Sequence, residues 1–133
     1  MQYVDKKSEF QFKNPEIKEI EFYTHEQFNS EIANIDIKIS PSISQTDIQN
    51  SAKVTLEVIV GGESDASPFF LRTKISSLFT WENDTENVDD LLNINAPTLL
   101  ISYLRPIITN ITDWSKYPKF KLPFINMVDI YEK

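Results

Sequence analysis

The segment from Ile94 to Pro118 constrains the fold more than any other part of the chain. It reads INAPTLLISYLRPIITNITDWSKYP, with apolar residues at helical spacing on one side and more of them on both flanks. A helix that is apolar on nearly every side has to be buried on more than one face. The spacing therefore predicts a long, largely buried helix from Asn95, which acts as its N-cap, to Trp114. Pro106 removes one backbone hydrogen bond and predicts a kink.

Three stretches before this helix alternate strictly between apolar and polar residues. They are 35–39, which ends at Ser40-Pro41, 53–60, which ends at the two glycines of the chain, and 69–81. Such alternation is typical of strands with one buried and one solvated face, as in an antiparallel sheet. We expect an antiparallel meander, with a bulge at Ser76-Ser77 in its third strand.

The remaining segments give weaker signals. Residues 8–13 alternate and end at Asn14-Pro15, which predicts a short strand, and 19–23 is predicted to be extended. The acidic stretch 81–90 is predicted to be a loop, 120–125 to cross the surface because Pro123 interrupts it, and 126–132 to form a short helix. Strands followed by helices predict one α+β domain over 1–133, with residues 1–7 disordered.

Composition excludes several classes of protein. A formal charge of −7 and a pI near 4.7 argue against a nucleic-acid partner, which needs a basic face. There is no cysteine, so disulfides and thiol chemistry are excluded. The N-terminus lacks the apolar core of a signal peptide, and no run reaches the roughly 20 apolar residues of a membrane span. We therefore expect a cytoplasmic protein without membrane insertion.

Few residues could carry out catalysis. His25 is the one histidine, and the sequence offers it neither an oriented partner nor a pocket. The acidic run 84–90 lacks the glycine and the ligand spacing of a calcium loop. We predict no enzyme, no metal and no cofactor. A carboxylate-based enzyme that uses Asp89 or Asp90 is the alternative.

Aromatic residues are numerous for one small domain, and several lie outside the predicted strands and the long helix. They make up 12% of the chain, and several lie in or beside loops and proline-rich segments: Trp81, Trp114, Tyr117, Phe120 and Phe124. They either pack loops onto the core or form an exposed groove, because large apolar patches mark binding sites.

Two segments resemble the SecB family of protein-export chaperones. They are APTLLISYLRPII, at 96–108, and YPKFKLPFINM, at 117–127, and the strands before them agree in order and spacing. The likeness covers roughly residues 8–130. It implies a four-stranded antiparallel sheet packed against a long kinked helix and a short C-terminal helix, assembled as a dimer or a dimer of dimers.

The resemblance also implies a function. Family members are ATP-independent holdases that bind unfolded polypeptides in apolar grooves during protein export. The alternative is a dedicated chaperone or binding module for one partner, such as the antitoxin of a toxin–antitoxin system. The residues expected to contact the client are Ile35, Ile37, Tyr103, Trp114, Phe120, Leu122, Phe124 and Ile125.

A second set of residues is expected to dock a partner protein. In the export chaperones, acidic residues on the outer sheet face receive the zinc-bearing tail of the SecA motor. Here Glu9 keeps one acidic position, whereas Lys13 and Arg72, beside Lys74, replace others. The resemblance therefore predicts that a basic tail meets repulsion on this face, which argues against SecA as a partner.

Overall fold

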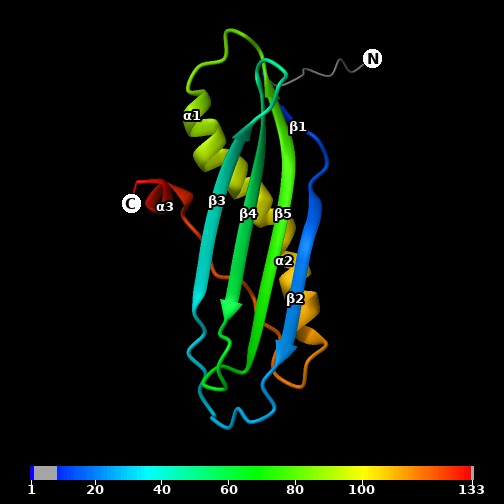
Figure 1. The fold of residues 1–133 in the computed structure, drawn as a ribbon, viewed down its shortest axis with the longest axis vertical. Coiled ribbons are helices and arrows are strands. Elements are labelled where there is room, and N and C mark those ends of the chain that lie inside the picture. The colour runs from blue at the N-terminus through cyan, green and yellow to red at the C-terminus, as the bar shows by residue number, and fades with distance from the viewer. Residues whose placement is uncertain (2–8, 133) are drawn as a thin grey trace.

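A five-stranded antiparallel sheet packs against one long helix in this computed structural model (Figure 1), which describes Met1 and residues 9–132. The disorder predicted for 1–7 lies, apart from Met1, outside the described residues. Three strands form the predicted meander: β3 (Ile37–Gln45), β4 (Ser51–Gly61) and β5 (Phe69–Trp81). The alternation of β4 has its expected consequence, since Ala52, Val54, Leu56, Val58 and Val60 are all fully buried.

The fourth row of the sheet consists of two strands rather than one. β1 (Phe10–Phe12) and β2 (Glu16–Thr24) both pair with β5, one after the other. Between them lie residues 13–15, where Pro15 has no N–H to give to the ladder. The prediction of four strands is therefore wrong by one, although the sheet is four strands wide.

Two predictions about strand irregularities are wrong. β3 does not end at Ser40-Pro41 but continues to Gln45, because it is an edge strand and an edge tolerates proline. There is no bulge at Ser76-Ser77, since the register between β4 and β5 is continuous. The irregularity lies instead in the neighbouring strand β2, between Ile17 and Glu19.

The helical region begins earlier than predicted. A short helix α1 (Val88–Asp90) and a π-helical turn η1 (Leu91–Asn95) lead directly into α2 (Ala96–Asp113). Part of the predicted loop is thus helical, and acidic residues in its first turn favour a helix start. Asn95 is not a cap, because its backbone is helical and its side chain makes no capping bond. The wide turn stands just before Pro97, whose ring would otherwise crowd the carbonyl four residues back.

One face of the sheet is covered and the other is open (Figure 1). α2 packs on β4 and β5 through Leu100, Leu104 and Ile108, which are fully buried. It continues through Pro106 without a break, and the kink stays a prediction. In the described part of the chain, no helix is both long enough and apolar enough to span a membrane.

After α2, residues 114–126 cross the covered face and end in α3 (Met127–Tyr131), as predicted (Figure 1). The Asn126 side chain caps α3 by accepting a hydrogen bond from the Val128 N–H. Arg105 of α2 holds this tail by donating to the carbonyl oxygens of Leu122 and Pro123. The tail is thereby fixed beside α2.

Candidate functional site

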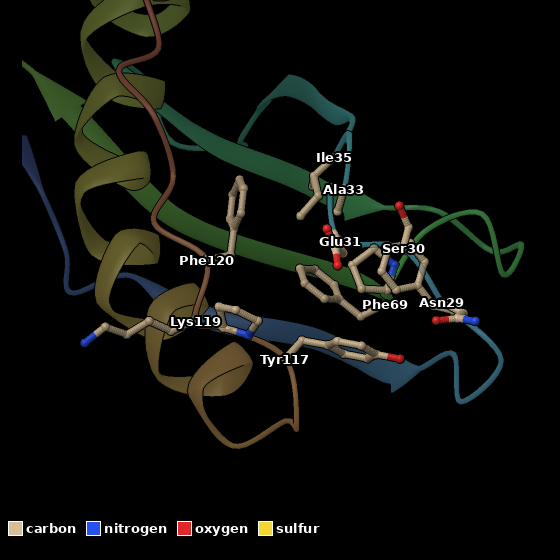
Figure 2. A pocket seen from close by; sticks show the side chains of 12 residues that line it. Asn29, Ser30, Glu31, Ala33, Ile35, Phe69, Tyr117, Lys119 and Phe120 are labelled. Carbon is tan, nitrogen blue, oxygen red and sulfur yellow. The ribbon is translucent and has the colours of Figure 1, made fainter.

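A pocket of about 360 Å³ opens at the end of the sheet where β5 begins (Figure 2). Its walls come from segments far apart in the sequence: the connection from β2 to β3, the start of β5 and the tail after α2. The lining residues are Phe28, Asn29, Ser30, Glu31, Ala33, Ile35, Pro68, Phe69, Tyr117, Pro118, Lys119 and Phe120. We call this the aromatic pocket.

Two edge-to-face ring pairs dominate the lining. The Phe69 and Phe120 centroids lie 6.4 Å apart at 70°, and those of Phe28 and Tyr117 lie 5.7 Å apart at 83°. This is the geometry that aromatic rings prefer. Phe69 belongs to the core, whereas the other three rings are only partly buried. The arrangement therefore offers ring surface to an apolar group that enters from solvent.

Polar contacts tie the two outer walls together. The Tyr117 hydroxyl donates to the His25 carbonyl oxygen at 2.6 Å, and Lys116 Nζ lies 2.9 Å from a Glu26 carboxylate oxygen. The hydrogen bond from Lys116 also holds the pKa of Glu26 below its usual range. The connection before β3 is thereby fixed to the tail after α2.

His25 has a structural role beside the pocket, next to the lining residue Pro68. Its backbone N–H donates to the Pro68 carbonyl at 2.9 Å. Its Nε2 lies 2.7 Å from the carbonyl oxygen of Gly62, so the proton of this contact sits on Nε2. The imidazole thus joins the connection after β2 to the turn between β4 and β5.

The client-contact residues predicted from the sequence fall into three groups. Ile35 and Phe120 line the aromatic pocket. Ile37 and Ile125 are partly buried against the core, and Leu122, only 6% exposed, is part of it and offers no surface. Outside the pocket, the exposed members are Tyr103, Trp114 and Phe124.

Of the four rings, sequence reasoning named only Phe120 as a client contact. Phe28 lies in a stretch that fits neither helical nor strand period, and Phe69 has the alternation of an ordinary core strand. Tyr117 is among the aromatic residues expected either to pack loops onto the core or to form an exposed groove, but it was not named as a client contact. No local pattern joins them, because their contacts are made between distant segments.

The predicted docking residues lie on and beside the open face. Arg72 contacts Glu19 at 2.8 Å, Glu57 at 3.4 Å and Glu21 at 3.5 Å. Lys74 also reaches Glu19, at 3.3 Å. Hydrogen bonds from Arg72, then from Lys74, hold the pKa of Glu19 below its usual range. The repulsion predicted at Arg72 is therefore offset by carboxylates from β2 and β4.

The other members of the docking set lie near the strand break. Glu9 is exposed, and its backbone oxygen accepts a hydrogen bond from the Glu82 N–H. Lys13 follows β1, and its N–H donates to the Leu78 carbonyl at 3.0 Å. Asp89 and Asp90, the carboxylates of the alternative enzyme, are exposed in the first turn of α1. Among the described residues, no group of three or more acidic, histidine or cysteine residues is placed to hold a metal.

Comparison with solved structures shows the same fold in other proteins. The SecB-like chaperone Rv1957 of Mycobacterium tuberculosis, in complex with a ChAD peptide from the Rv1956 HigA1 antitoxin, is 10% identical with a TM-score of 0.70; the match covers 89% of this chain and 88% of that one. A protein of unknown function from Streptococcus agalactiae is 11% identical with a TM-score of 0.56, over 87% of this chain and 98% of that one.

Comparison of sequences identifies the family. Protein-export protein SecB from Paraburkholderia xenovorans and that from Paraburkholderia phymatum are each 31% identical to this chain over 88 residues. The match covers 62% of this chain but only 56% of each relative, so it spans little more than half of their length. The family model described as preprotein translocase subunit SecB matches residues 4–133. The chain therefore belongs to the SecB family.

Proposed function

We propose that this protein is an ATP-independent chaperone that holds non-native polypeptides through the aromatic pocket. The observation that carries the proposal is the pair of ring contacts at the pocket walls, which leaves three partly buried aromatic side chains facing solvent in a member of the SecB family. Ring surface accepts many apolar side chains, because the interaction is largely non-directional. We place this activity in the cytoplasm, where new polypeptides are still unfolded.

The alternative is a chaperone dedicated to one partner. It is favoured by the solved SecB-like relative, which is bound to a peptide from an antitoxin. The two proposals differ in client range and not in the site. A general holdase protects unrelated clients, whereas a dedicated chaperone protects only its own.

The proposal is tested by diluting chemically denatured, unrelated proteins into increasing amounts of this protein without ATP. We expect light scattering to fall to baseline near one oligomer per client, because each bound client is removed from aggregation. Protection of only one client among several would favour the dedicated chaperone. Unchanged scattering at several-fold excess for every client would contradict a general holdase.

We also propose that the protein is a homo-oligomer. Phe12, Ile17 and Ile20 pair with buried residues of β5 and so lie on the covered face of the sheet, yet they are 42%, 39% and 47% exposed. Tyr103 of α2, 40% exposed, adjoins Phe12, with the two ring centroids 6.4 Å apart. We call these four residues the apolar strip. A second copy of the chain is the proposed cover, since such strips are typical of subunit interfaces.

Introducing a charge into the apolar strip is expected to lower the mass of the oligomer. Ile20→Lys would place an ammonium group where the partner subunit packs, and sedimentation velocity would show a smaller species. Ile48→Lys is the matched control, because Ile48 is 68% exposed on the turn between β3 and β4. The proposal fails if both variants sediment like the unsubstituted protein, or if that protein is already monomeric.

We do not extend the proposal to the SecA motor. On the open face, Glu16, Glu19, Glu21 and Glu57 each already pair with a lysine or arginine. A basic tail would have to displace these cations before it could bind the carboxylates. A partner that docks on this face would therefore have to be something other than a basic tail.

A further inference from the structure

A second pocket, of about 220 Å³, lies on the open face of the sheet. It is located where residues 13–15 separate β1 from β2, the break visible at the right of Figure 1. Ser76 of β5, a small side chain that is 3% exposed, forms part of the floor. The break in the edge strand and this small residue together leave the hollow.

Three lysines converge on this hollow in a chain whose formal charge is −7. They are Lys13 from the break, Lys18 from β2 and Lys53 from β4, and we call their site the basic notch. Lys18 is placed by the β-bulge between Ile17 and Glu19, a feature that often re-aims side chains. Lys53 is on the central strand β4, so its backbone is held by hydrogen bonds to strands on both sides.

The positive charge of the notch is only partly neutralised. Glu16 is the one acidic residue in the lining, and Lys18 pairs with it at 2.7 Å. Within the range 9–132, Lys13 and Lys53 have no carboxylate partner. The pKa of Glu16 is below its usual range mainly because of Lys18, with a further contribution from Lys53, so the field of Lys53 reaches across the notch.

Uncharged hydrogen-bonding groups complete the site. Asn14 and Ser76 line the notch together with the lysines, and so does Thr46, whose hydroxyl already donates to backbone carbonyls at the turn between β3 and β4. Ammonium groups combined with hydroxyl and amide donors recognise carboxylates through charge-assisted hydrogen bonds. We propose that the basic notch binds an acidic segment of a partner polypeptide, with one carboxylate between Lys13 and Lys53 and a neighbouring one near Lys18. This inference goes beyond client holding, since none of its residues lines the aromatic pocket.

The test uses a fluorescein-labelled glycine–serine peptide that carries a central run of glutamates. We expect its fluorescence anisotropy to rise on binding and the affinity to fall with added salt, because exposed charges are screened. In the double variant Lys13→Gln and Lys53→Gln, the affinity is expected to drop about tenfold. The matched control is Lys38→Gln with Lys121→Gln, which changes the net charge equally at exposed lysines outside the notch.

Three results would overturn the inference. The first is no peptide binding by the unsubstituted protein, and the second is equal weakening in both double variants, which would assign the effect to net charge alone. The third is displacement of the peptide by inorganic phosphate at the same concentration, which would make the notch a small-anion site. Scattering assays on the Lys13→Gln and Lys53→Gln variant are expected to show unchanged client protection, so failure here and failure of the holdase proposal are distinguishable.

Discussion

Replacing Phe28 with asparagine is expected to weaken the binding of an unfolded client about tenfold or more. Phe28 forms one wall of the aromatic pocket, and its ring meets Tyr117 edge to face at 5.7 Å. The substitution removes this ring surface and puts an amide in its place. Because Phe28 is only partly buried and lies outside the main core, we expect the fold to remain intact.

The measurement is fluorescence anisotropy with a labelled, permanently unfolded polypeptide. Tyr131→Asn is the matched control, since it also replaces a partly exposed aromatic ring with asparagine but lies on α3, outside the pocket. Urea unfolding of both variants checks that stability is retained. Equal loss of binding in the two variants would mean that exposed rings in general hold the client, and the pocket would lose its assigned role.

Much of the sheet could be predicted from the sequence because a strand's pattern records which face is buried. In β4 every second side chain is fully buried, and in β5 the inward residues from Phe69 to Phe79 follow the same rule. One-residue slips would turn each apolar side chain to solvent, so the pattern specifies the register as well. The bounds of the outer strands were harder to predict. Pro41 lies inside the edge strand β3, whereas Pro15 lies in the break between β1 and β2, and the local sequence does not show which neighbours each proline has.

The candidate site could not be predicted in the same way. Its ring contacts join Phe28 to Tyr117 and Phe69 to Phe120, and its walls are tied by contacts such as Lys116 to Glu26, 90 positions apart. The sequence around each of these residues has nothing that distinguishes it from an ordinary strand or loop. Leu122 illustrates the converse error: it lies between partly exposed Phe120 and exposed Phe124, yet its own side chain turns into the core.

On the open face, the effect of a charged residue on a partner depends on the charges with which that residue is paired. Arg72 occupies a position where the family resemblance led us to expect an acid, and alone it predicts repulsion of a basic tail. The fold brings Glu19 and Glu21 of β2 and Glu57 of β4 to the same guanidinium. Lys13 and Lys53 form no salt bridge with any described carboxylate, and both line the notch where residues 13–15 separate β1 from β2. The charge expected of a partner on this face therefore depends on which of its charged residues remain unpaired.

Substituting the two adjacent glycines with alanine, one at a time, is expected to destabilise the protein strongly at Gly61 and hardly at all at Gly62. Gly61 ends β4 with φ of +84°, and a Cβ there would lie 2.1 Å from the Phe69 carbonyl oxygen. The backbone of β5 cannot yield easily, because this oxygen also accepts hydrogen bonds from the Gly62 N–H and the Ser67 hydroxyl, both at 3.1 Å. Combining a strained φ with this clash, Gly61→Ala should lower the free energy of unfolding by about 3 kcal/mol.

Gly62→Ala is the matched control for this experiment. A Cβ at Gly62 would meet its nearest neighbour, Ser67 Cβ, at 3.8 Å, which is ordinary contact, and its φ lies outside the left-handed region. We expect its free energy of unfolding to change by less than about 1 kcal/mol, with any gain coming from the restricted unfolded chain. Urea denaturation followed by tryptophan fluorescence measures both variants. Equal stabilities for the two would show that the turn relaxes freely, and the Phe69 carbonyl oxygen would then not restrict the residue at position 61.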